Sequence, residues 1–76
     1  MITTKPNTLV WHLFHPQTLA SVDCIAYVRD DKQVEVLIQQ NDEPHQFGVY
    51  RDAEVAVHAA FRLQGQMLAN GWEKIV

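Results

Sequence analysis

The chain has 76 residues, of which six are Lys or Arg and nine are Asp or Glu, so its formal net charge at pH 7 is −3. This length predicts a single small domain over residues 1–76. A domain of this size buries a smaller fraction of its unfolded surface than a large one does, so it gains stability from a partner. The apolar fraction of 47% excludes wholesale disorder. The basic residues are scattered, which argues against nucleic acid as a partner because phosphate binding needs clustered positive charge.

The first elements are an arm and a strand. Residues 1–7 contain Pro6 and predict a loosely held N-terminal arm. Residues 8–14 are rich in β-forming side chains and stop before Pro16, so they predict a strand. Strict alternation would place Leu9 with Trp11 and Leu13 on one face, and Val10 with Phe14 on the other.

A hairpin follows. Residues 21–29 and 33–40 alternate as strands around the polar turn 30–32. Residues 41–44 predict a second turn, and residues 45–50 a short strand at a sheet edge. Small or β-branched side chains mark the face that we expect beneath a helix: Val22, Cys24, Ala26, Val28, Val34, Val36 and Ile38. Consecutive strands with short connections normally pair antiparallel.

Residues 52–70 predict one amphipathic helix. Asp52 is a good N-cap, and Asn70 followed by Gly71 is a typical C-terminal stop. In this register Trp72 folds back toward Met67, and residues 72–76 predict a last short strand. The fold class is therefore α+β: an antiparallel β-meander of three to four strands with one C-terminal amphipathic helix packed on one face.

The helix carries more apolar surface than one sheet needs. Its apolar side chains span an arc of about 200°, whereas an ordinary surface helix needs an apolar stripe of about 100°. Glu54, His58 and Arg62 mark the opposite, polar face. Gln64 lies within the apolar arc, and we expect its amide to reach a backbone group or a helix–helix contact with a second copy.

The sheet face directed away from the helix is the second candidate surface. Its predicted members are Asp23, Ile25, Tyr27, Arg29, Glu35, Leu37 and Gln39. Ile25, Tyr27 and Leu37 form an apolar patch bordered by charges, to which Trp11 or Phe14 could add. Exposed patches of this kind mark contact sites. The predicted interaction surface is Ile25, Tyr27, Leu37, Gln64 and Trp11; the alternative is that the N-terminal arm covers the patch.

No residue pattern predicts a catalytic, cofactor or metal site. His12 and His15 are three apart in a strand, so they point to opposite faces. Cys24 lies on the expected core face, where burial raises the pKa of a thiol. A single cysteine cannot form an internal disulfide and suits a reducing compartment.

These observations predict a small, non-enzymatic protein-interaction or regulatory module that acts as a cytoplasmic homo-oligomer, without cofactors and without a membrane span. Two alternatives remain. The first is a nucleic-acid-associated regulator whose Arg29, Arg51 and Arg62 converge in a dimer. The second is a small-molecule binder or enzyme with a pocket at the subunit seam, near Gln64, His12 and Tyr27.

Overall fold

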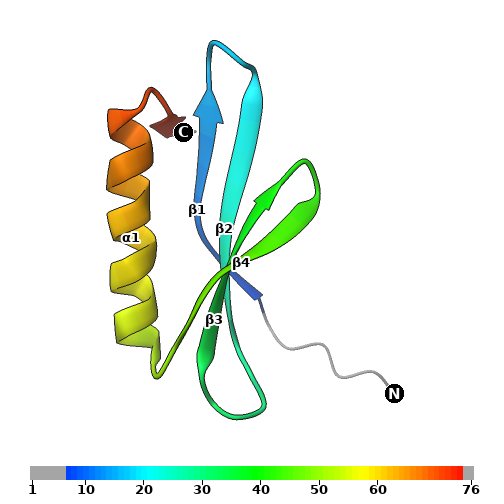
Figure 1. Ribbon diagram of the computed structural model, residues 1–76, viewed down its shortest axis with the longest axis vertical. Coiled ribbons are helices and arrows are strands. Elements are labelled where there is room, and N and C mark those ends of the chain that lie inside the picture. The colour runs from blue at the N-terminus through cyan, green and yellow to red at the C-terminus, as the bar shows by residue number, and fades with distance from the viewer. Residues whose placement is uncertain (1–6, 75–76) are drawn as a thin grey trace.

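The computed structural model describes residues 7–74 and shows an α+β fold, in which an antiparallel sheet packs on one C-terminal helix, as predicted (Figure 1). The strands follow the order β4-β3-β2-β1-β5, so β1 to β4 form a meander. The elements are β1 (Asn7–His15), β2 (Ala20–Val28), β3 (Val34–Gln40), β4 (Glu43–Tyr50), α1 (Ala53–Ala69) and β5 (Glu73–Lys74).

The core lies between α1 and one face of the sheet. The strand register places β2 and β3 side chains of the predicted face opposite one another, as in the pairs Cys24–Ile38 and Ala26–Val36. The helix contributes two small buried side chains, Ala56 and Ala60, which allow its backbone to approach the sheet closely. The buried apolar residues are Trp11, Leu13, Val22, Cys24, Val34, Val36, Ala56 and Ala60.

Strand β1 departs from strict alternation. A β-bulge interrupts its pairing with β2 between Leu9 and Trp11, so Leu9 pairs with Ile25 while Trp11 pairs with Cys24. The expectation that Leu9 shares a face with Trp11 and Leu13 is therefore wrong, because the extra residue shifts the register by one. Val10, predicted on the face of Phe14, packs instead against the core.

The connection between β3 and β4 is tighter than predicted. Asn41 and Asp42 both have positive φ, at 55° and 63°, as in the two-residue turns that match the twist of a hairpin. Strand β4 therefore begins at Glu43 rather than at residue 45. Pro44 lies within it, which is tolerated because β4 is an edge strand, as predicted.

Both ends of α1 follow the predicted capping. The Asp52 side chain accepts a hydrogen bond from the Val55 N–H at 2.9 Å. At the C-terminus Gly71 has a φ of 97°, and the Trp72 N–H donates to the Met67 carbonyl at 3.1 Å. This contact turns the chain back, so that Glu73–Lys74 pairs with Leu13 and Phe14 of β1. Trp72 precedes β5 rather than belonging to it, and Asn7, predicted in the arm, begins β1. Residues 75–76 of the predicted last strand and residues 1–6 of the arm lie outside the described residues.

The apolar arc of α1 extends beyond the part of the helix that packs on the sheet, as the sequence predicted. Val57 is 40% exposed and Phe61 is 48% exposed, although both belong to the arc. Gln64 is half-buried on the helix, and its side chain has no hydrogen bond to another residue within 7–74. Within residues 7–74, α1 is too short and too polar to cross a membrane.

Candidate protein-contact surface

The outer face, meaning the face of the sheet opposite α1, carries an apolar row at its centre. The register aligns Leu9 of β1 with Ile25 of β2, and Ile25 with Leu37 of β3. We call these three residues the aliphatic row. Leu9 is 59% exposed, and the other two are half-buried. Since α1 lies on the opposite side, no element within residues 7–74 covers the row.

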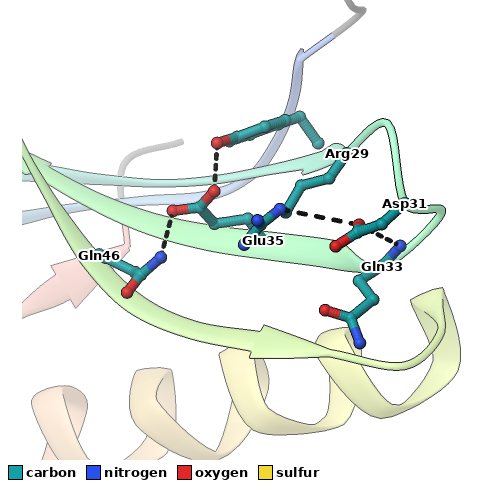
Figure 2. Close-up of polar contacts among 6 residues, drawn as sticks. Arg29, Asp31, Gln33, Glu35 and Gln46 are labelled. Atoms are coloured by element: carbon teal, nitrogen blue, oxygen red, sulfur yellow. Dashed lines mark hydrogen bonds and ion pairs between the residues drawn. The ribbon is translucent and has the colours of Figure 1, made fainter.

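A hydrogen-bonded polar group borders the aliphatic row on one side. Tyr27 pairs with Glu35 across β2 and β3, and its hydroxyl donates to Glu35 Oε1. Gln46 of β4 donates from Nε2 to Glu35 Oε2 at 2.6 Å. Figure 2 shows the Gln46 side chain directed at the Glu35 carboxylate. Glu35 is only 8% exposed. The two hydrogen bonds hold both of its carboxylate oxygens in place on the sheet.

Hydrogen bonding shifts the acid–base behaviour of this pair in opposite directions. The bonds from Tyr27 and Gln46 favour the ionised carboxylate and lower the pKa of Glu35 below its ordinary value of 4.5. The bond to Glu35 favours the protonated phenol and raises the pKa of Tyr27 above its ordinary value of 10.0. Glu35 is therefore a fixed negative charge at neutral pH.

The same group opens onto a polar hollow at the β2–β3 turn. Arg29 lies 3.7 Å from Asp31, measured from Nε to Oδ1, and the Asp31 carboxylate also accepts from the Gln33 N–H (Figure 2). The hollow is lined by Tyr27, Arg29, Asp30, Asp31, Glu35 and Gln46. Three carboxylates and one guanidinium give this lining a net charge of −2 at neutral pH.

A second polar pair borders the aliphatic row on its other side. His12 of β1 pairs with Asp23 of β2, and the Nδ1 atom of His12 contacts the Asp23 carboxylate. Gln39 of β3 continues this line of residues across the sheet. The outer face therefore has an apolar centre between two bonded polar borders.

The Tyr27–Glu35 bond predicts a specific pH dependence. A group with a lowered pKa contributes stability above its unfolded pKa, whereas one with a raised pKa contributes stability below it. We expect Tyr27→Phe to lower the free energy of unfolding at neutral pH. The difference from the wild type should shrink as the pH falls from 4.5 through the lowered pKa of native Glu35. It should also shrink as the pH rises from 10 through the raised pKa of native Tyr27. Urea titrations across this pH range measure the difference.

Gln46→Ala is the matched control for this prediction. It removes the other donor to Glu35 but no ionisable group, so its effect should shrink only at acid pH. Equal effects of Tyr27→Phe at all pH values would contradict the assignment of the bond.

The structure brings together three of the five predicted surface residues. Ile25, Tyr27 and Leu37 lie side by side on the outer face, as the register shows. Trp11 does not join them, because its position after the bulge directs the indole into the core, where it is 5% exposed. Gln64 is on α1, on the other side of the sheet.

Sequence reasoning missed Leu9 and the role of Gln46. Leu9 reaches the outer face because of the bulge in β1. The sequence from Leu9 to Trp11 contains no glycine or other turn-forming residue that would indicate this bulge. A second irregularity, between Val36 and Leu37 in the pairing of β3 with β4, places Gln46 opposite Leu37 and within reach of Glu35. Gly48, which follows closely, was the available signal, since glycine within a strand often marks a bulge.

The histidines and the cysteine have separate surroundings. His12 faces outward, and His15 lies edge-on against Trp72, with ring centroids 5.2 Å apart. Their opposite orientation was predicted. Cys24 is fully buried, and this burial raises the pKa of its thiol to about 11, also as predicted. Within residues 7–74, no three His, Cys, Asp or Glu side chains gather as a metal-ligand set.

The groups invoked by the two alternative functions do not converge within one chain. Arg29 lies near the Asp31 carboxylate and Arg51 near that of Asp52, so neither pair adds net positive charge to the surface. Arg62 is exposed on α1. For the proposed small-molecule pocket, His12 and Tyr27 are on the outer face, and Gln64 is on the helix side of the sheet.

In comparisons with known proteins, the chain matches no protein-family model, no curated protein and no solved structure.

Proposed function

We propose that this chain is a non-enzymatic protein-interaction module whose outer face contacts a partner protein. The aliphatic row carries the proposal, because it places Leu9, Ile25 and Leu37 in one line across three strands on a face without a described covering element. Protein contact surfaces combine an apolar centre with a polar rim. The Tyr27–Glu35 and His12–Asp23 pairs provide such a rim on either side.

The charge of the outer face favours a basic partner. Its hollow carries a net charge of −2, and Glu35 within it is held in the ionised form. Two copies of this face packed on each other would bring like charges together, which disfavours self-association through it. A partner that presents aliphatic side chains next to Lys or Arg fits both the row and the hollow.

Two further properties belong to the proposal. The module acts as a homo-oligomer, supported by the exposed apolar side chains of α1, Val57 and Phe61. It works in the cytoplasm, supported by its single cysteine, Cys24, a free thiol of the kind that persists in a reducing compartment.

Comparative capture from the host extract tests the contact surface. We expect immobilised wild-type protein to retain a partner that Leu37→Asp loses, because an ionised carboxylate in the aliphatic row opposes burial against another protein. Retention should also fall as salt increases, since the partner is expected to be basic.

Leu19→Asp is the matched control for this substitution. Leu19 is exposed in the β1–β2 turn and has a φ of 61°, a conformation that Asp tolerates better than Leu. This variant should retain the partner. Identical retention by wild type and by folded Leu37→Asp, with folding checked by circular dichroism, would reject the outer face as the contact surface.

A further inference from the structure

The two edges of the sheet differ in how they are protected. Native edge strands avoid unwanted pairing through charges, proline, bulges or covering elements. Strand β4 follows this rule, because it carries Glu43, Pro44 and an irregularity next to Gly48. Strand β1 has nine residues, Asn7–His15, with no Asp, Glu, Lys, Arg or Pro among them. Within residues 7–74, only β5 pairs with its free edge, at Leu13 and Phe14.

Apolar side chains flank the open part of β1 on both faces of the sheet. Leu9 is exposed on the outer face. On the helix side, an apolar cavity of about 240 Å³ lies between the start of β1 and the first turns of α1. Val57 of α1 lines this cavity together with Thr8 and Val10 of β1, and exposed Phe61 lies next to Val57. Exposed apolar side chains thus lie near the unpaired edge on both faces of the sheet.

We propose that the open edge of β1 binds β1 of a second copy of this chain, with the two strands antiparallel. This inference deepens the homo-oligomer part of the proposed function. An antiparallel pair of identical strands has two-fold symmetry, so the same residues meet on both sides. The absence of Asp, Glu, Lys and Arg along β1 favours this occupant, since two such edges pair without burying the charge of any of these side chains.

The geometry of the two aliphatic rows supports a two-fold axis near Leu9. Leu9 is the end of the row at the edge of the sheet. Pairing centred there brings Leu9 of both copies together on the outer face and joins the two rows end to end. On the helix side, it brings Val57 and Phe61 of one copy toward those of the other. The dimer then presents one outer face of twice the width.

A disulfide cross-link tests the position of the axis. In the Cys24→Ala background, Leu9→Cys should form a covalent dimer under mild oxidation, because directly opposed residues of antiparallel strands are within reach of a disulfide. Leu19→Cys in the same background is exposed in the β1–β2 turn and should remain monomeric. A similar extent of cross-linking for both cysteines would overturn the proposal.

A charge placed on the edge tests the association itself. Thr8 is exposed on β1 and lies off the aliphatic row, so Thr8→Lys adds like charges near the two-fold axis without altering the outer face. In light scattering, wild type should have the mass of a dimer, and Thr8→Lys should weaken the dimer at least tenfold. Phe47→Lys, an exposed position on β4, should leave the mass unchanged.

The outcomes separate this inference from the proposed contact surface. A monomeric wild type, or a folded Thr8→Lys with the wild-type mass, would refute the edge dimer while leaving the Leu37→Asp experiment unaffected. If deletion of residues 75–76 is needed before the chain dimerises, then its own C-terminus occupies the edge and the proposal is wrong. Loss of the dimer in Thr8→Lys with unchanged partner capture by Leu37→Asp would support the edge and reject the outer face.

Discussion

Trp11→Ala should lower the free energy of unfolding by about 3–5 kcal/mol, as expected for removal of a buried aromatic side chain. Trp11 is 5% exposed, and its Nε1 donates to the Ala60 carbonyl at 2.8 Å, so one side chain joins β1 to the middle of α1. The total stability of domains is about 5–15 kcal/mol, and small domains tend to lie low in this range. We therefore expect much of the variant to be unfolded at room temperature.

Trp11→Phe separates packing from hydrogen bonding. It keeps an aromatic ring in the core but removes the indole N–H, and we expect a smaller loss of about 1–2 kcal/mol. Urea titration followed by circular dichroism measures both variants, with exposed Leu19→Ala as a control that should change the stability little. A cost below about 1 kcal/mol for Trp11→Ala would mean that the indole is not part of the core.

The native Cys24 thiol should react with a disulfide reagent at least a hundredfold more slowly than the thiol of the unfolded chain. Thiolate is the reactive species, and burial raises the pKa of Cys24 from 9.0 to about 11. At pH 7–8 this shift alone reduces the thiolate population about a hundredfold. Burial reduces the labelling rate further, because Cys24 has no exposed surface for the reagent to reach.

Denaturant provides the internal control for this prediction. The labelling rate should rise to that of an unprotected thiol as the chain unfolds, and Trp11→Ala should approach this rate without denaturant. Rapid labelling of the native wild type would show that β2 is accessible from the helix side or that the sheet opens frequently.

Local chemistry made the helix and the hairpins predictable. Asp52 and Gly71 act through groups a few residues away, so their effects do not depend on the rest of the fold. Alternation in β2 and β3 is unbroken, and the core face that it predicts packs under α1. Val28 is the exception: it was predicted on this face but is 53% exposed at the end of β2. The surplus apolar arc of α1 was also predictable, because side-chain directions on a helix follow from its period.

The bulge in β1 was not predictable, and it decides which residues reach the outer face. Strands with large apolar side chains on both faces offer no contrast from which to locate a shift in register. The run from Leu9 to Phe14 is of this kind. Leu9 was therefore expected to share a face with Trp11 and Leu13, and the sequence did not decide which face of the sheet that was. The extra residue of the bulge instead places Leu9 and Trp11 on opposite faces.

The polar border of the outer face depended on contacts between strands. Glu35 and Tyr27 are eight residues apart and meet only when β2 and β3 pair. Gln46 comes from a third strand, and its position depends on the irregularity near Leu37. Composition could indicate a charged rim, but not which carboxylate would be fixed in it.

The pairing of β5 with β1 has a consequence for the order of folding. Strands β1 to β4 each pair with a neighbour along the chain, and such local contacts form early. The contact of Lys74 with Leu13 spans nearly the whole chain, so it forms only after α1 has folded back across the sheet. During this interval the full length of β1 has a vacant side, and a second chain that arrives then competes with β5 for it. High protein concentration during refolding therefore favours pairing of β1 with a second chain over pairing of β1 with its own β5.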